Sequence, residues 1–212
     1  MTTTVHKANS DFWSAVFPAP QPTQDAKLLR QIGFIPRLKE VLTLRQVHGL
    51  EHATVWVLSG AAHTSILGDN RNQASKDSDG LGGLSTEQGF HFYGQVKTSD
   101  VSRAVSEALR RIKSEWNLAV HPRCGTNLSV EIVLTAGLAW GAFTLLPKGP
   151  IEQLLGFGVA ATAAAQLTPE LGRVIQQYIT TAIPFNLEVQ DISVVQDAWG
   201  RPAHFVEVQW IE

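Results

Sequence analysis

The sequence predicts an α+β fold that is mainly helical, with a membrane-embedded helical hairpin and a small antiparallel sheet that includes a C-terminal β-hairpin. Three observations support this fold class. Two apolar runs joined by a Pro-Lys-Gly-Pro turn fill residues 128–167. Residues 25–62 and 100–116 have helical periodicity. Two alternating runs flank a Gly-Arg-Pro turn within residues 197–202, near the C-terminus.

The length and composition indicate one domain, or one domain plus a membrane element, and they offer no electrostatic case for nucleic acid. The chain has 212 residues, a net charge of −2 and a charged fraction of 17%, below the value of about a quarter that is usual in soluble domains. A nucleic-acid partner is therefore not expected. Cys124 is the only cysteine, which excludes an internal disulfide and is typical of a reducing compartment. The N-terminus lacks the basic and apolar segments of a secretory signal.

The N-terminal half divides into an arm and a folded region. Residues 1–24 are rich in Thr, Pro and Gln, so we expect an extended arm. Residues 25–127 follow as a helical or α+β region. Within it, Pro36 predicts a break between a short first helix and a longer second helix that ends near Gly60.

The middle of this region predicts a loop, a strand and a helix. Gly, Asn, Asp and Ser dominate residues 64–89, which indicates a mobile, lid-like loop. This segment lacks the Gly-Lys-Ser/Thr ending of a phosphate-binding loop. Residues 90–96 alternate and are rich in aromatic side chains, so we expect a strand. Ser99 or Asp100 would then cap a helix that runs to Trp116.

Residues 128–167 predict a transmembrane helical hairpin. The run 128–146 carries one charge, Glu131, and is long enough to cross a bilayer, whereas the run 151–167 is marginal. We expect faces of small residues on the two helices to pack together, because small residues let backbones approach closely in lipid. These faces would comprise Gly137 and Gly141 on one helix, and Gly158 and Thr162 on the other. The alternative is a buried hairpin of a soluble protein.

Residues 168–212 predict a helix followed by a β-hairpin. Thr168, with Pro169 at the first helical position, is a typical helix start. The alternating segments on either side of residues 197–202 would form the two strands.

Basic residues place the bulk of the protein on the cytoplasmic side of the membrane. The turn at the tip of the hairpin carries only Lys148. The flanks of its open end carry more arginine and lysine, which the positive-inside rule assigns to the cytoplasm. These residues are Arg103, Arg110, Arg111, Lys113, Arg123 and Arg173. We therefore expect an integral membrane protein in contact with lipid.

The second predicted helix carries the motif His-x-x-Glu-His, formed by His48, Glu51 and His52. Positions four apart lie on one helix face, so the two imidazoles can share a metal ion, with zinc the default for nitrogen ligands. Glu51 lies beside this face and would act as general base toward a metal-bound water, as in the inverted zincin motif. The alternative is an ordinary polar helix face.

A second cluster, His-Pro-Arg-Cys-Gly-Thr-Asn, lies directly before the hairpin and contains His121, Arg123 and Cys124. Arg123 would lower the pKa of the thiol and stabilise a developing oxyanion. Together the two motifs predict one zinc site, with ligating atoms within about 4 Å of one another. Its ligands would be His48, His52, Cys124 and either His121 or water. The alternative is an inert cysteine in a turn.

The order of these motifs resembles the YqhQ-like family of bacterial membrane proteins, which are predicted metal-dependent enzymes. The resemblance rests on the two motifs and on the downstream segment QQYITTAIPFNLEV, residues 176–189. It implies His48, Glu51, His52, His121, Arg123 and Cys124 as signature positions. The whole chain resembles a related cyanobacterial membrane family more closely. It differs from the YqhQ-like pattern in having fewer hydrophobic spans, Ala53 in place of Lys, and Asn127 in place of Ser.

Two functions are compatible with these residues. The first is a membrane-anchored zinc protein that acts as a metal-dependent hydrolase, with Glu51 and Arg123 as catalytic residues. The second is a non-enzymatic scaffold or assembly factor with a structural metal, either in a larger complex or as a homo-oligomer. The cyanobacterial resemblance implies photosynthetic complexes as partners, and the thylakoid or plasma membrane as location. Three protein ligands plus water would indicate a catalytic site, and four a structural one.

Overall fold

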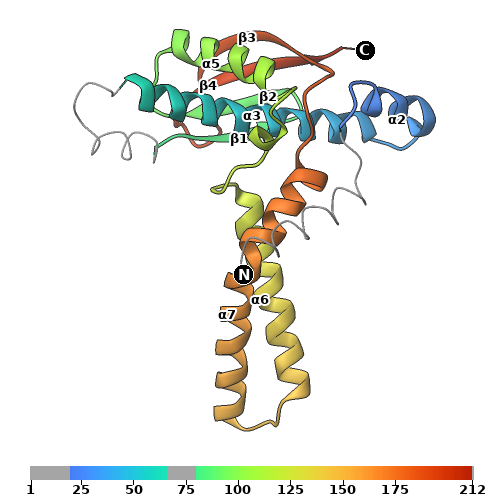
Figure 1. Ribbon diagram of the computed structural model, residues 1–212, viewed down its shortest axis with the longest axis vertical. Helices are drawn as coiled ribbons and strands as arrows, with labels where there is room; N and C mark the ends of the chain where they lie inside the picture. Colours follow the sequence, from blue (N-terminus) through green and yellow to red (C-terminus); the bar gives the residue numbers. More distant parts are fainter. Residues whose placement is uncertain (1–19, 66–79, 212) are drawn as a thin grey trace.

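The computed structural model describes residues 20–65 and 80–211. It consists of a globular part, in which helices lie against a small sheet, and a long helical hairpin that extends away from it (Figure 1). The predicted α+β class and the antiparallel sheet are confirmed. The predicted arm over residues 1–19 and the part of the predicted loop over residues 66–79 lie outside the described residues.

Four antiparallel strands form the sheet in the order β1-β2-β4-β3. Their bounds are β1 Gly82–Thr86, β2 Gly89–Tyr93, β3 Leu187–Gln196 and β4 Pro202–Trp210. β3 and β4 form the predicted C-terminal hairpin. Asp197 closes its turn by accepting hydrogen bonds from the backbone N–H groups of Trp199 and Arg201, both at 2.9 Å. Gly200 in this turn has a φ of 76°, which glycine adopts without strain.

The loop predicted over residues 64–89 is wrong at its C-terminal end, because residues 82–86 form β1. This strand runs antiparallel to β2, with Gly83 opposite Phe92. A glycine-rich segment has little intrinsic preference for a strand. Here, however, β2 offers an open edge whose backbone groups pair with those of β1.

α3, Leu38–Ser65, lies along the sheet and carries the His-x-x-Glu-His motif. The break predicted at Pro36 separates it from α2, Gln24–Ile32. α3 does not end near Gly60 as predicted; it continues to Ser65.

α5, Thr98–Arg111, packs beside α3 (Figure 1). The helix predicted to run to Trp116 is shorter than expected, since a separate 3₁₀ turn, η1, spans Trp116–Ala119. An apolar core joins α3, α5 and the sheet. Its fully enclosed members include Val47, Leu50, Phe90, Phe92, Val101 and Ile112.

α6, Gly125–Leu145, and α7, Pro150–Ile175, form the helical hairpin that projects from the globular part (Figure 1). Among the helices that the structure describes, α6 is the one long and apolar enough to cross a membrane, by length and composition. Both helices expose large apolar side chains, among them Ile132, Val133, Trp140, Leu154, Leu155 and Val159. The helical hairpin is present, and its insertion in a membrane stays a prediction.

The two helices of the hairpin do not meet along the predicted glycine faces. A Cβ atom added at Gly137, Gly141 or Gly158 would have no neighbour within 4 Å. α7 instead buries small residues at every fourth position, namely Gly156, Ala160, Ala164, Thr168 and Gly172. A Cβ atom at Gly156 would lie 2.5 Å from Leu146 Cδ1 and 3.2 Å from Ala142 Cβ, so Gly156 faces the other helix of the hairpin. The small-residue packing is therefore of the expected kind, in a different register.

α7 also passes through Thr168 and Pro169, where the sequence predicts a new helix start. Thr168 does not cap a helix; its Oγ1 donates to the carbonyl of Ala164 at 2.8 Å. Pro169 removes a single backbone hydrogen bond, and α7 continues past it to Ile175. A π-helical turn, η2, Gln176–Thr180, then follows α7 directly.

Candidate metal centre

α3 presents two histidines on one face, as the spacing predicts. The rings of His48 and His52 lie edge to face, with centroids 4.3 Å apart. His52 is buried and His48 is half-buried. Because both side chains belong to one rigid helix, their separation is fixed before any ligand binds.

Backbone carbonyls fix the tautomer of both histidines. His52 Nδ1 lies 2.7 Å from the carbonyl oxygen of Ala119, and His48 Nδ1 lies 3.0 Å from that of Thr180. A carbonyl oxygen only accepts hydrogen bonds, so Nδ1 of each ring carries the proton and donates it. The lone pair of each neutral ring is then on Nε2, which is the usual arrangement of a metal-binding histidine.

Cys124 lies at the N-terminus of α6, with its thiol directed toward these rings. Its Sγ is 3.3 Å from His48 Nε2 and accepts a hydrogen bond from the backbone N–H of Thr126 at 3.4 Å. Burial raises the pKa of the thiol, but the adjacent His52 ring and Thr126 outweigh it, and the pKa is lowered overall. A thiolate at a helix N-terminus is a good metal ligand.

The three predicted ligands His48, His52 and Cys124 therefore come together. One ligand atom from each lies within 4.8 Å of the other two, somewhat wider than the predicted separation. A tetrahedral zinc ion with bonds of roughly 2.1 Å to nitrogen and 2.3 Å to sulfur holds two nitrogens and one sulfur about 3.4–3.6 Å apart. The Cys124–His48 distance of 3.3 Å already has this size. Small side-chain rotations would close the remaining gap.

His121 lies next to this group of three and is not part of it. Its ring centroid is 5.7 Å from that of His52. Its Nδ1 accepts a hydrogen bond from the backbone N–H of Arg123 at 3.3 Å, so the proton of the neutral ring is on Nε2. Burial, together with the nearby His52 and Arg123, lowers the pKa of His121 to about 4. The ring is thus a neutral hydrogen-bond donor near pH 7, without a free lone pair for a metal.

Glu51 lies in the same cleft as the three ligands and outside the group that they form. Ser85 of β1 donates a hydrogen bond of 2.5 Å from its Oγ to the Glu51 carboxylate. Burial raises the pKa of Glu51, and the Ser85 hydrogen bond and the electrostatic interaction with His48 offset only part of the rise. A carboxyl group with a raised pKa is suited to exchange protons near neutral pH.

The cleft has a volume of about 560 Å³ and is closed on one side by β1. Gly83 of this strand packs on Glu51: an added Cβ atom would lie 2.5 Å from Glu51 Cδ. Arg123, predicted from the sequence, also lines the cleft. Ser85 and Gly83 were not identified from the sequence, because their segment has the composition of a loop.

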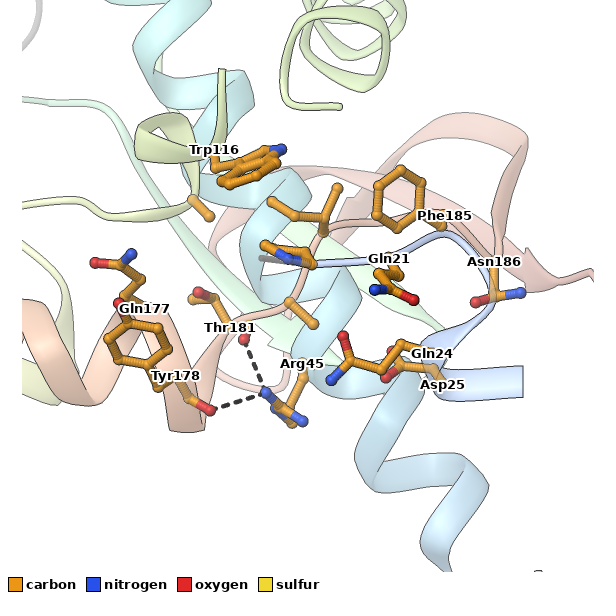
Figure 2. Close-up of a pocket in the computed structure, with 14 residues that line it drawn as sticks. Gln21, Gln24, Asp25, Arg45, Trp116, Gln177, Tyr178, Thr181, Phe185 and Asn186 are labelled. Carbon is orange, nitrogen blue, oxygen red and sulfur yellow. Dashed lines mark hydrogen bonds between the residues drawn. The ribbon is translucent and has the colours of Figure 1, made fainter. Parts of the chain in front are cut away.

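Arg45 of α3 forms hydrogen bonds with the π-helical turn, the same turn that accepts a hydrogen bond from His48. Figure 2 shows its guanidinium beside the carbonyl oxygens of Tyr178 and Thr181, to which it donates at 3.1 and 3.2 Å. These contacts fix the turn whose Thr180 carbonyl orients His48. The turn belongs to QQYITTAIPFNLEV, residues 176–189, one of the segments on which the family resemblance rests. The resemblance therefore pointed to this segment, but it did not predict that the segment would orient His48.

Gln176, fully buried at the start of the same turn, holds the segment that precedes Cys124. Its Oε1 accepts from the backbone N–H of His121 at 2.8 Å, and its Nε2 donates to Asn127 Oδ1 at 2.8 Å. Asn127 in turn donates to the carbonyl of Pro122 at 2.7 Å. The side chain of Gln176 therefore spans both ends of the turn that carries Cys124.

Comparison with known proteins agrees with the cyanobacterial part of the resemblance. A family model described as a domain of unknown function, DUF6391, matches residues 43–192, which contain every residue of this centre. The chain belongs to the DUF6391 family. This DUF6391 protein is also 48% identical over 204 residues to an uncharacterised protein of Picosynechococcus sp. (strain ATCC 27264 / PCC 7002 / PR-6), covering 96% of this chain and 97% of the relative. No solved structure matches it significantly. A relationship to the YqhQ-like family stays a prediction.

Proposed function

We propose that this protein is a membrane-anchored zinc hydrolase. One observation carries the proposal: ring nitrogens of His48 and His52 and the sulfur of Cys124 converge within 4.8 Å, beside a cleft that also contains Glu51. The protons on both Nδ1 atoms leave the Nε2 lone pairs for a metal ion. The resemblance to predicted metal-dependent enzymes of the YqhQ-like family supports the same function.

Zinc fits the donor set better than magnesium or calcium. Two imidazole nitrogens and a thiolate are borderline and soft ligands, whereas magnesium and calcium prefer oxygen. Three protein ligands leave a fourth position for water, which is the arrangement of catalytic zinc sites. His121 would then be a hydrogen-bond donor beside the centre and not a ligand.

Glu51 and Arg123 would supply the remaining chemistry. Glu51, with its raised pKa, would accept a proton from water at the open position and pass it to the leaving group. Arg123, which lines the cleft, would stabilise negative charge on the substrate oxygen. Ser85 would orient the Glu51 carboxylate through their hydrogen bond.

The hairpin of α6 and α7 would anchor the protein in lipid, with the globular part on the cytoplasmic side of the plasma or thylakoid membrane. Its exposed apolar side chains and the basic residues at its open end support this location. Reporter fusions after Lys148 and at the C-terminus should report opposite sides of the membrane. Extraction of the protein by salt alone, without detergent, would contradict the anchor.

A structural role for the metal is the second candidate, in a scaffold or assembly factor of a larger membrane complex. The ligands come from α3 and from the N-terminus of α6, so a metal would fasten the hairpin to the globular part. Removal of the metal would then loosen this attachment and would not affect any turnover.

Elemental analysis of the purified full chain tests the centre. We expect about one zinc ion per chain, and loss of zinc in Cys124→Ala, because a site with two remaining ligands binds weakly. Ser129→Ala is the matched control, since Ser129 is exposed on the same helix. Hydrolysis of p-nitrophenyl acyl esters, abolished by a chelator and restored by zinc, would support the enzyme over the scaffold. A wild-type protein without zinc would contradict both.

A further inference from the structure

A second, larger cleft lies at the root of the helical hairpin. It has a volume of about 990 Å³, at the upper end of the range of small-molecule sites, roughly 300–1,000 Å³. One wall comes from α3, η1 and the turn before α6, and the other from α6, α7 and η2. Its apolar lining includes Trp56, Trp116, Val120, Pro122, Ala165 and Pro169.

Both tryptophans line this cleft, and both have the indole N–H already bonded to a backbone carbonyl. Trp56 Nε1 donates to the carbonyl of Val120 at 2.9 Å, and Trp116 Nε1 donates to that of Lys113 at 3.3 Å. Both residues are nevertheless 38–40% exposed. Large, partly exposed rings whose N–H groups are already bonded offer an apolar surface to a ligand.

This cleft reaches the metal centre through a single side chain. His121 lines both clefts. Its ring centroid lies 5.0 Å from that of Trp56 and 5.7 Å from that of His52. A molecule held between the tryptophans and α7 would therefore have one end beside His121, whose ring is the neighbour of His52.

The charged groups of the cleft favour an uncharged ligand. Glu131 and Arg173 line it and have opposite signs. Arg173 already forms a salt bridge with Glu170 at 2.8 Å. A phosphate would therefore have to compete with Glu170 for this guanidinium, and it would also be repelled by the carboxylate of Glu131. Asn117 and Gln177 add neutral hydrogen-bonding groups.

We propose that this cleft binds an uncharged amphiphile, an acyl chain esterified to a neutral head group, and presents it to the metal centre. The proposal rests on the function proposed above and names its substrate class. With the hairpin in a bilayer, the cleft lies at the level of the lipid head groups, where tryptophan is enriched. Such a ligand can enter sideways from the lipid.

The reaction of such an ester is balanced with water alone. The oxygen of water adds to the acyl carbon, and the C–O bond to the head group breaks. Glu51 takes one proton from the water and returns it to the departing alkoxide, which leaves as the alcohol. The acid and the alcohol are the only products.

Photolabelling of the full chain in detergent tests the binding site. The probe is a monoacylglycerol with a diazirine in its acyl chain. We expect it to label peptides that contain Trp56, residues 116–122 and residues 165–177. Ala165→Trp should reduce this labelling about tenfold, because Ala165 is exposed in the wall of the cleft and a larger ring fills the space. Leu167→Trp, 52% exposed on the same helix and outside the cleft, should label normally.

Competition and zinc content decide among the outcomes. Excess unlabelled monoacylglycerol should suppress the labelling, while an alkyl phosphate of equal chain length should not. Equal competition by the phosphate, undiminished labelling of Ala165→Trp, or labelling spread evenly along α6 and α7 would each overturn the proposal. Zinc measured in the same samples separates the two proposals: zinc without cleft labelling refutes the amphiphile site alone, and labelling without zinc refutes the zinc centre alone.

Discussion

His48 Nδ1 donates its proton to the carbonyl oxygen of Thr180 across 3.0 Å, although the two residues are 132 positions apart in the chain. The contact joins α3 to the π-helical turn after α7. Thr180, which lies outside the histidine motif, therefore determines that Nε2 of His48 is the ring nitrogen that faces Cys124. π-Helical turns occur often at functional sites, and this one connects the hairpin directly to the centre.

We predict that two neighbouring histidines differ in their effect on metal binding. His52→Ala should abolish stoichiometric zinc binding, because His52 belongs to the group of three side chains that could hold the ion. His121→Ala should retain the metal, since the Nδ1 of His121 already accepts a hydrogen bond from Arg123. Titration with cobalt(II), followed through its thiolate charge-transfer band, measures both variants. A loss of cobalt binding in His121→Ala would make His121 a fourth ligand and favour the structural role.

Local sequence signals predict those parts of the centre that lie within one element. The helical spacing of His48 and His52 determines their common face, and the chemistry of Cys124 suggests it as their partner. Carbonyl acceptors such as those of Ala119 and Thr180 have no side-chain signature, so no sequence pattern reveals them. Ser85 is equally hidden, because its contact with Glu51 depends on the pairing of a glycine-rich strand.

The register of the helical hairpin shows a second limit of sequence reasoning. α7 contains two stripes of small residues with four-residue spacing, one through Gly158 and Thr162 and one through Gly156 and Ala160. Both satisfy the pattern for close helix packing. Only the positions of the facing side chains decide between them, such as Ala142 of α6 and Leu146 just after it. These positions depend on the length and conformation of the connecting turn. Spacing alone therefore predicts the kind of contact and not its register.

A matched pair of glycine substitutions tests the role of β1 in holding Glu51. In Gly83→Ala, the new Cβ atom would lie 2.5 Å from Glu51 Cδ, so the carboxylate must move away from Ser85. We expect a loss of about 1–3 kcal/mol in the free energy of unfolding, from overpacking and from the weakened hydrogen bond. In Gly82→Ala, the added Cβ atom meets nothing within 4 Å, and stability should change little. Denaturant titration of both variants measures the difference; equal stabilities would argue against the contact.

The buried amide of Gln176 should be required for the position of Cys124. Gln176→Leu leaves the N–H of His121 without its acceptor and Asn127 Oδ1 without its donor. Each unsatisfied buried group costs about 1–3 kcal/mol, so stability and zinc affinity should fall together. Gln177→Leu is the control, because Gln177 is exposed next to it. Zinc affinity unchanged in Gln176→Leu, measured by competition with a chelator, would show that the turn keeps its shape without this residue.

The C-terminal β-hairpin should lose stability in acid through Asp197. Burial raises the pKa of Asp197, but hydrogen bonds from the backbone and guanidinium of Arg201, from Tyr93 and from the backbone of Trp199 outweigh it, and the pKa is about 2, below the ordinary 3.8. A lowered pKa means that the folded state favours the charged form. The stabilisation is therefore complete above pH 3.8 and declines as the pH falls toward 2. Asp197→Asn should flatten this part of the stability profile, recorded by circular dichroism between pH 2 and 6; an unchanged acid slope would assign it to other carboxyl groups.

Glu51→Gln separates catalysis from structure at the centre. The substitution keeps the size of the side chain and its hydrogen bond with Ser85, and removes the group that accepts a proton. Because Glu51 is not among the three ligands, the variant should bind zinc like the wild type. Hydrolysis should fall by about 10²–10⁴-fold, the usual contribution of a general base. Zinc content, unfolding free energy and ester turnover measured on one preparation give the result. Full turnover in a zinc-loaded variant would remove Glu51 from the mechanism, and loss of zinc would show instead that its carboxylate supports the ligands.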